Sequence, residues 1–182
     1  MNSNALCPSF KMLLFLFCFF VCFSVFHCPI YAQENPPKPF DVKVNVGVAQ
    51  YLDFGRFCYS TSSGTVSIDP NSDARTSLNI ILISSNPQPH AAIFEVQAIE
   101  NTLITIVNGP DVSLGGTGGG SMNLHIGASD HGSSFIAQGK SLEIDKMVTT
   151  YVKIGGTLNV GTSGANPPGN YIGTFTVTFI QQ

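Results

Sequence analysis

Gly169-Asn170-Tyr171-Ile172-Gly173-Thr174-Phe175-Thr176-Val177-Thr178-Phe179-Ile180, near the carboxyl terminus, is the stretch that decides the fold. Along it, every second residue is aromatic, apolar or glycine, and the residues between are mostly threonine. Because successive side chains of a strand point to opposite faces, the stretch predicts a strand with an aromatic inner face and a threonine-rich outer face. The inner face consists of Tyr171, Gly173, Phe175, Val177 and Phe179. Such a strand needs a neighbour in a sheet and a second layer beneath it.

Stretches of the same kind recur through the chain, separated by turn residues. They predict roughly nine to eleven short strands, at the spacing typical of a sandwich. Only 142–146 has the pattern of a single helical turn. We therefore expect an all-β, immunoglobulin-like β-sandwich in a single domain. The predicted strands lie at 42–48, 65–68, 77–84, 92–98, 102–107, 121–126, 133–137, 148–154, 157–160 and 171–180.

Two parts of this pattern carry more specific predictions. The run 77–84 is almost continuously apolar, which is typical of a central strand that is covered on both faces. The strands at 92–98 and 102–107 are separated only by the residues around Glu100-Asn101. This spacing predicts a β-hairpin.

The amino terminus has the pattern of a secretory signal peptide. Lys11 precedes an uncharged apolar run from Met12 to Phe26, and the small residue Ala32 stands directly before a polar stretch. A transmembrane anchor needs nearer to about twenty apolar residues, and Cys28-Pro29 interrupts the run first. We therefore expect 1–32 to be a cleaved signal peptide, 33–39 a proline-rich leader and 40–182 the β-sandwich domain. The protein would be secreted, to the periplasm, the outer surface or the medium, and would meet a membrane only during export.

The net charge argues against nucleic-acid binding, and the cysteine content argues against a disulfide within the chain. Removal of Lys11 with the signal leaves seven Lys and Arg against eleven Asp and Glu, a net charge of −4. A mildly acidic domain has no electrostatic footprint for nucleic acid. Four of the five cysteines also lie in the signal, so the remaining thiol, Cys58, cannot form a disulfide within its own chain. Between Phe57 and Tyr59 it is expected to be a small buried hydrophobe, with an exposed thiol that pairs between chains as the alternative.

Four motifs occur in order along the mature chain: Leu52-Asp53-Phe54-Gly55-Arg56-Phe57, Gly64-Thr65-Val66-Ser67-Ile68, Gly155-Gly156-Thr157-Leu158-Asn159-Val160 and Pro168-Gly169-Asn170-Tyr171-Ile172-Gly173-Thr174-Phe175-Thr176-Val177. With them the chain resembles the bacterial domain-of-unknown-function family 4402 over nearly its whole mature length. That family consists of secreted bacterial domains without established activity, so the resemblance implies a compartment and an architecture. Its motif residues here are Leu52, Asp53, Phe54, Gly55, Gly155, Gly156, Gly169, Tyr171 and Phe175.

The chain is also similar, more weakly, to pilin subunits of the spore-coat-protein-U type. That resemblance implies an immunoglobulin-like sandwich in which the amino-terminal segment of a neighbour supplies a missing strand. Two features depart from it: such pilins usually carry disulfide-forming cysteines, and the chain before Leu52 has only one strand's worth of alternation, 42–48, after prolines that cannot donate to a ladder. We therefore expect this strand to complete its own sandwich, with donation to a neighbour as the alternative.

Asp69, Asn71 and Asp73 have the alternate-oxygen spacing of a calcium-binding loop. However, Ala74 stands where such a loop needs glycine for its sharp turn, and Ile80 stands where it needs a bidentate glutamate. A turn between two strands explains the same three residues. No metal is therefore expected, and calcium is the one metal worth testing.

None of the remaining sequence patterns indicates a catalytic site. The glycines from Gly115 to Gly120 lack the Lys-Ser/Thr pair of a phosphate-binding loop and are expected to form a mobile hairpin loop. His125 is expected on the outer face of a strand and His131 in a loop, with a catalytic role for either as the weaker alternative. The chain is expected not to be an enzyme and to carry no cofactor.

These patterns favour a secreted or cell-surface structural module of a bacterium, pilin-like or adhesin-like. Its expected partners are other copies of itself or other surface subunits, which it would meet through edge strands. The alternative is an extracellular module that binds a glycan or a calcium-dependent ligand. That function would need exposed aromatic side chains, for which Tyr51, Tyr59 and Tyr151 are the candidates.

Overall fold

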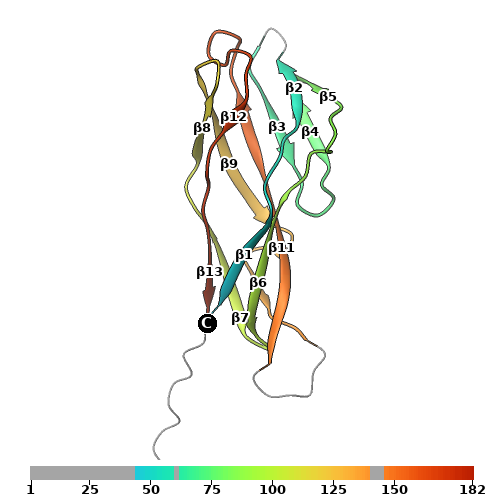
Figure 1. Ribbon diagram of the computed structural model, residues 1–182, viewed down its shortest axis with the longest axis vertical. Coiled ribbons are helices and arrows are strands. Elements are labelled where there is room, and N and C mark those ends of the chain that lie inside the picture. The colour runs from blue at the N-terminus through green and yellow to red at the C-terminus, as the bar shows by residue number, and fades with distance from the viewer. Residues whose placement is uncertain (1–43, 60–61, 140–145) are drawn as a thin grey trace, which may run out of the picture. The chain divides into compact units, whose positions relative to one another are not determined.

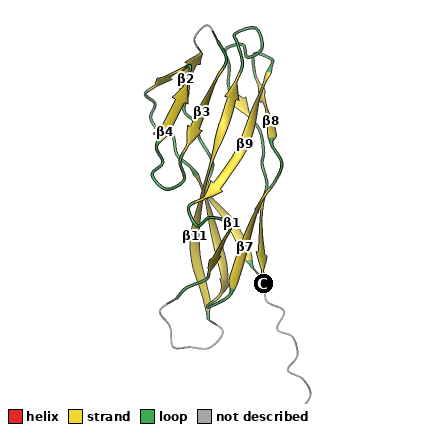
Figure 2. Cartoon of the chain, turned by 180° about the vertical axis from the view of Figure 1, so that it is seen from behind, coloured by secondary structure: helices red, strands yellow, loops and turns green. Residues whose placement is uncertain are grey.

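The computed structural model describes residues 44–59, 62–139 and 146–182. The chain divides into Met1–Phe40 and Asp41–Gln182, and all of these residues belong to the second unit. The predicted signal peptide (1–32) and leader (33–39) lie outside the described residues, as does the helical turn predicted at 142–146 apart from Lys146. The described part contains only strands and loops (Figure 2), so no helix there is long and apolar enough to cross a membrane.

Thirteen strands make up the described part of the chain, and all paired strands are antiparallel. The strands are β1 Asn45–Gln50, β2 Arg56–Tyr59, β3 Gly64–Ile68, β4 Arg75–Leu78, β5 Ile80–Ile83, β6 Ala92–Ile99, β7 Leu103–Asn108, β8 Val112–Gly116, β9 Ser121–Ser129, β10 Ser134–Ile136, β11 Met147–Val160, β12 Tyr171–Ile172 and β13 Val177–Gln181. The all-β prediction is therefore confirmed.

The strands form two facing layers. The larger sheet has the order β1-β6-β11-β9-β8-β12, with β3 beside β11 and β4 beside β3. A smaller sheet has the order β10-β7-β13, and a separate ladder joins β2 to β5. The ring of Phe94, on β6, lies edge-on to that of Phe175 at 6.2 Å and tilted against that of Phe179 at 5.7 Å. These contacts join β6 to the β13 segment across the interior, so the fold is a sandwich (Figure 1).

The strands outnumber the roughly nine to eleven predicted because long ladders are interrupted at matching positions. β1 and β2 lie along β6 and β5, and the backbone groups of Asp53 and His90 bridge the interruption. β7 and β8 lie along β10 and β9 in the same way, and β13 and β12 lie along β7 and β8. Each interruption divides one long strand into two short ones.

The core is formed by the inner faces of a few alternating strands. Along β6 every second side chain is buried, as expected when one face of a sheet is covered. β9 has the alternation predicted for 121–126, with its odd-numbered residues exposed at that stretch. The largest fully buried apolar side chains are Ile104, Ile154, Val66, Val96, Val152 and Val160.

The prediction of a central strand at 77–84 is wrong. The run is divided between β4 and β5 at Asn79, which has a left-handed backbone with φ 56°. Asparagine tolerates this conformation better than most residues, so the chain can turn there from one sheet to another. β4 pairs only with β3 and β5 only with β2. Both are therefore edge strands, with Leu78 exposed by 64% and Ile81 by 60%.

Two predictions about connections are also wrong. The turn at Glu100-Asn101 does not close a hairpin, because β6 pairs with β1 and β11 while β7 pairs with β10 and β13. It carries the chain from one sheet to the other. The two strands predicted at 148–154 and 157–160 are one strand, β11, whose partner on one side changes from β6 to β3 near Gly155. A Cβ at Gly155 would collide with the carbonyl oxygen of Ile68, so glycine allows β3 to lie this close.

The closing strand has the predicted faces but not the predicted continuity. Tyr171, Phe175, Val177 and Phe179 are half-buried, and the residues between them are exposed. The regular pairing is confined to β12 and β13, with an irregular segment at 173–176 between them. Among the described strands, β12 pairs only with β8 and β13 only with β7, so the closing strand lies at an edge.

Candidate functional site: a groove between two sheet edges

A groove opens between two edges of the sandwich. One wall is formed by residues 51–58, which run into β2, and the other by residues 166–175, which include β12. Figure 1 shows the backbone course of β2 and β12. The groove has a volume of about 1010 Å³. Its floor consists of Leu114, Met122, Leu124 and Leu158. Because protein interiors are close-packed, with few voids larger than a water molecule, this space over an apolar floor is the candidate site of the molecule.

The Leu52-Asp53-Phe54-Gly55 motif builds the first wall. Asp53 exchanges two backbone hydrogen bonds of 3.0 Å with His90, and its Oδ1 accepts a hydrogen bond of 2.7 Å from the Gly55 N–H. Gly55 has a φ of 65°, and a Cβ there would lie 2.6 Å from Cγ of Pro89. The motif therefore bends the chain between β1 and β2, which continue along β6 and β5, while Phe54 enters the core.

Arg75 ties this wall to its neighbours. Its Nη1 donates to the carbonyl oxygens of Phe54 at 2.9 Å and Arg56 at 3.0 Å. Its Nη2 donates to the carbonyl oxygen of Ile83 at 2.9 Å. Two backbone acceptors of the first wall are thus already used within the domain.

The second wall ends at Phe175 and continues into β13, which among the described strands pairs only with β7. The carbonyl oxygen of Thr176 accepts from the Gly109 N–H at 2.9 Å, and the N–H of Gln182 donates to Leu103 at 3.0 Å. Even-numbered residues of this segment therefore direct their backbone groups to β7. Because the direction alternates along an antiparallel strand, the N–H and C=O groups of Phe175, Val177 and Phe179 point away from β7, to the open side.

Asn166, which sequence reasoning missed, holds the start of the second wall. It is 1% exposed, its Nδ2 donates to the carbonyl oxygen of Ser121 at 2.6 Å, and its Oδ1 accepts from the Gly161 N–H. The neighbouring prolines predicted only a turn. Its burial depends on Ser121, which is remote in sequence and could not be inferred from local pattern.

Further motif residues stabilise the segment that follows Asn166 in the second wall. Tyr171 Oη donates to the carbonyl oxygen of Pro167 at 2.6 Å. Gly169 lies against the β8–β9 turn, where a Cβ would be 2.8 Å from Oγ1 of Thr117. Gly156 packs beside Leu124 under the groove floor. The structure thus places the motif residues at the walls, floor and strand switch of one region.

Below the groove, the two edges continue as an open seam between β1 and β13. β1 pairs with β6, so the expected pairing of this strand within its own domain is confirmed for Asn45–Gln50. Val46 lies opposite Val96 and Val48 opposite Phe94, and directly opposed side chains share a face. Yet Val46 is 41% and Val48 54% exposed, while both partners are buried. The described part of the chain therefore covers the apolar face of β1 only about half.

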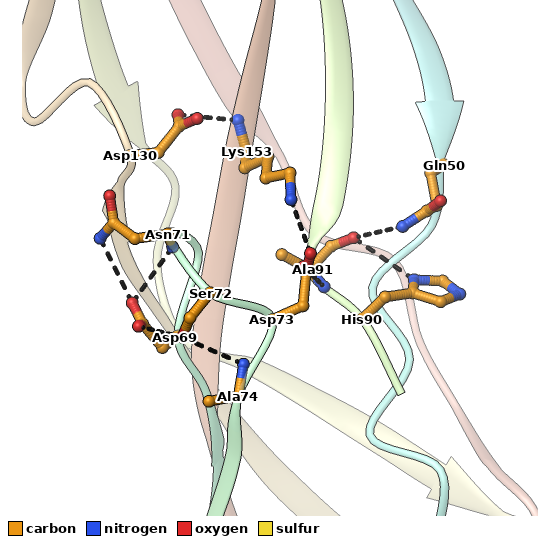
Figure 3. A network of polar contacts seen from close by, with 10 residues as sticks. All are labelled: Gln50, Asp69, Asn71, Ser72, Asp73, Ala74, His90, Ala91, Asp130 and Lys153. Atoms are coloured by element: carbon orange, nitrogen blue, oxygen red, sulfur yellow. Dashed lines mark hydrogen bonds and ion pairs between the residues drawn. The ribbon is translucent and has the colours of Figure 1, made fainter. Parts of the chain in front are cut away.

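The calcium candidates do not converge on one point (Figure 3). Asp69 accepts from the Asn71 N–H at 3.2 Å and from Ser72 Oγ at 2.5 Å, and the Ser72 hydrogen bond foremost lowers the pKa of Asp69. Asp73 instead accepts from the Ala91 N–H at 3.0 Å and from Lys153 Nζ at 2.6 Å. The predicted turn is confirmed, and among the described residues no group of three His, Cys, Asp or Glu could hold a metal ion.

The histidines are separate from the groove. His125 lies on the outer face of β9, as predicted, with Nδ1 2.7 Å from Asp111, and this hydrogen bond lowers the pKa of the Asp111 carboxyl. His131, in the predicted loop, lies 2.7 Å from Asp130 and against the ring of Phe135. Neither residue lines the groove, so the structure brings no titratable pair to its floor.

The structure also tests the predictions for Cys58 and for the exposed tyrosines. The burial predicted for Cys58 is wrong: β2 turns Phe57 inward, so the next side chain faces outward and the thiol is exposed. Of the aromatic candidates, Tyr51 lines the groove and is 81% exposed, whereas Tyr151 is 58% exposed and does not line it. The side chain of Tyr59 lies outside the described residues.

The fold and the groove define a class: an all-β sandwich domain in which two strand edges have no partner among the described residues, on either side of an apolar opening. The family described as a domain of unknown function, DUF4402, matches residues 44–180, and the chain belongs to that family. Comparison with curated proteins and with solved structures finds no match.

Proposed function

We propose that the protein is a secreted or surface-displayed structural module of a bacterium, without catalytic activity, that works by accepting an extended polypeptide strand. The groove carries this proposal. Its floor is apolar, and its second wall, which ends at Phe175, continues into β13, whose backbone groups at Val177 and Phe179 point away from β7. Addition of a strand to a sheet edge uses both features: backbone hydrogen bonds supply affinity, and alternate side chains enter the pockets beneath.

The secreted compartment rests on the apolar run that ends before Ala32 and on the absence of charge within it. The assignment to pilin-like or adhesin-like modules rests on the edge-strand geometry. Both kinds of module function by presenting strands and edges rather than by chemistry at a centre.

Binding of peptides to the purified mature chain, Gln33–Gln182, tests strand acceptance. The probes are fluorescent nine-residue peptides with apolar residues at every second position, beside peptides of the same composition without alternation. We expect anisotropy to rise only with the alternating peptides. Val177→Pro should abolish the rise, because proline removes an N–H that points to the open side while leaving the β7 ladder intact. Absence of binding by every alternating peptide contradicts the proposal.

Glycan binding is the second candidate. It is supported by Tyr51, exposed at the rim of the groove, and by a separate hollow of about 480 Å³ whose lining includes the amides of Asn79, Asn123 and Asn159. Neutral amides suit the hydroxyl groups of a sugar, but Tyr51 does not line this hollow. A glycan array read against Tyr51→Ala and Asn123→Ala separates the candidates, since binding lost in either variant favours the glycan.

A further inference from the structure

We propose that the hollow lined by Asn79, Asn123 and Asn159 is a second binding site, which takes one ring of a neutral polysaccharide. This site does not depend on strand acceptance, because among the described residues the hollow and the groove share only Asn166. A row of side chains across four strands, the poor strand propensity of asparagine and the uncharged lining of the hollow support it.

The hollow lies over one row of side chains on the outer face of the larger sheet. Leu78 is opposite Thr65 in the ladder of β3 and β4, and Thr65 is opposite Asn159 in the ladder of β3 and β11. Asn159 is in turn opposite Asn123 in the ladder of β9 and β11. Directly opposed residues share a face, with Cβ atoms about 4.5–5.5 Å apart. All four residues line the hollow of about 480 Å³, so four strands present one continuous surface to a ligand.

Asparagine is an unexpected residue at two positions of this row. It is depleted in strands, yet Asn123 and Asn159 lie on β9 and β11, which are interior strands of the sheet. Both side chains are exposed, so neither contributes to the core. Asn79 differs, because its left-handed backbone with a φ of 56° already accounts for asparagine there. A residue that opposes the local structure without a gain in packing indicates a function, so Asn123 and Asn159 mark the site.

The exposed amides keep hydrogen-bonding capacity for a ligand. A carboxamide has two N–H donors and one oxygen acceptor. Asn123 Nδ2 donates to Asp111 Oδ2 at 3.2 Å, which uses one donor, and Asn79 Nδ2 donates to the carbonyl oxygen of Ser63 at the long distance of 3.4 Å. Asn166 is different: it is buried, and its amide binds backbone groups of the domain. Asn166 therefore supports the hollow, and the exposed amides are the groups that meet a ligand.

The lining favours a neutral ligand that has both a polar and an apolar side. None of the described lining residues is charged, and the Asp111 carboxylate beside Asn123 repels an anionic ligand. Leu78, exposed by 64%, adds an apolar surface to the same hollow. A sugar ring carries hydroxyl groups around its edge and C–H groups on its faces. It can therefore donate to and accept from the amides while a C–H face packs against Leu78.

A second polar row extends this surface beyond the hollow. Ser67 is opposite Thr157, with their hydroxyl oxygens 2.9 Å apart, and Thr157 is opposite His125. These residues lie two positions along their strands from the first row, so they are on the same face of the sheet. The next rings of a sugar chain anchored in the hollow would lie over hydroxyl and imidazole groups. A polymer is therefore a better ligand than a free monosaccharide.

The test is affinity electrophoresis of the mature chain in native gels that each contain one polysaccharide: a β-glucan, an arabinoxylan, a galactomannan or, as the anionic comparison, polygalacturonate. Asn159→Val removes the central amide of the row and should not lower stability, because valine favours strands more than asparagine does. Asn45→Val is the matched control, since it makes the same change at an exposed position of β1, outside the hollow. Thermal unfolding confirms that both variants fold.

We expect at least one neutral polysaccharide to retard the wild type and Asn45→Val, and Asn159→Val to bind it roughly tenfold or more weakly. Polygalacturonate should retard none of them. Tyr51→Ala should bind as the wild type does, because Tyr51 lines the groove and not the hollow.

Three results overturn the inference: no retardation by any neutral polysaccharide, equal retardation of Asn159→Val and the wild type, or loss of retardation in Tyr51→Ala. Each of them leaves strand acceptance standing, because that proposal depends on the alternating peptides. Asn159→Val should bind these peptides as the wild type does. Failure of the peptides alone overturns strand acceptance and leaves the hollow as a polysaccharide site.

Discussion

β1 and β6 are neighbouring strands with the same alternation, yet their side chains end in different environments. They pair residue for residue from Asn45 to Val48, with Val46 opposite Val96. Val96 is 1% exposed and Val46 is 41% exposed. The difference arises from the opposite layer: β6 lies under the rings of Phe175 and Phe179, while β1 lies beyond the edge of that layer. Backbone pairing and apolar burial are thus separate conditions, and β1 meets only the first.

The largest expected effect tests this difference directly. Val96→Ala should lower the free energy of unfolding by about 2–3 kcal/mol, because it removes two methyl groups from a packed core. Val46→Ala, one position across the same ladder, should cost less than about 1 kcal/mol, since much of that side chain is already in water. Urea unfolding of the two variants measures both values. Equal losses would contradict an uncovered β1.

The second effect concerns Gly55, which lies between β1 and β2 in the first wall of the groove. Gly55→Ala should destabilise the domain by about 1–3 kcal/mol, because a φ of 65° disfavours a side chain and Cβ would approach Pro89 and Ser85. Gly164→Ala is the matched control, since a Cβ there meets nothing within 4 Å. It should change stability by less than about 0.5 kcal/mol. Similar unfolding midpoints for the two variants would show that the motif does not constrain the wall.

The smallest expected effect concerns β6. Asp73 fixes the start of this strand by accepting a hydrogen bond from the Ala91 N–H. Burial raises the pKa of Asp73, but hydrogen bonds from Lys153 and Ala91 outweigh it and lower the pKa overall. A lowered pKa in the folded state means that stability is fully present above the ordinary value for Asp, near pH 4, and is lost as pH falls through the folded-state pKa.

Asp73→Asn should therefore reduce the loss of stability between about pH 5 and pH 2. At neutral pH its cost should stay below about 1 kcal/mol, because the ion pair with Lys153 is partly exposed. Urea unfolding as a function of pH measures both quantities. An unchanged pH dependence in the variant would show that Asp73 does not contribute to it.

Much of the fold was predictable from the sequence, because alternation records which residues face a covered layer. The faces of the closing strand, the outward His125 and the turn at Asp69 to Asp73 follow from local pattern. The partners of each strand do not. Asn79 and Gly155 decide where the chain leaves one sheet or changes its neighbour, and both decisions depend on contacts distant in sequence.

The candidate site was less predictable for the same reason. The Leu52-Asp53-Phe54-Gly55 motif and Tyr171 were recognisable as motif residues, but a groove is the space between segments that are more than a hundred positions apart. Cys58 illustrates the limit of prediction from sequence neighbours. Its aromatic neighbours suggested burial, but Phe57 faces inward in β2, so the side chain of Cys58 faces outward. The seam depends on β1 and β13 both lying at sheet edges among the described strands, and local sequence does not encode a strand's partners.

The central claim, that the β13 edge is open and accepts a strand, is tested most directly by hydrogen exchange of single amides along 175–180. In the monomeric mature chain, the amides of Phe175, Val177 and Phe179 should exchange quickly, and those of Thr178 and Ile180, which face β7, should exchange slowly. On peptide binding, the three odd-numbered amides should become protected. Equal protection of odd and even amides in the monomer, or no gain on peptide binding, would contradict the account.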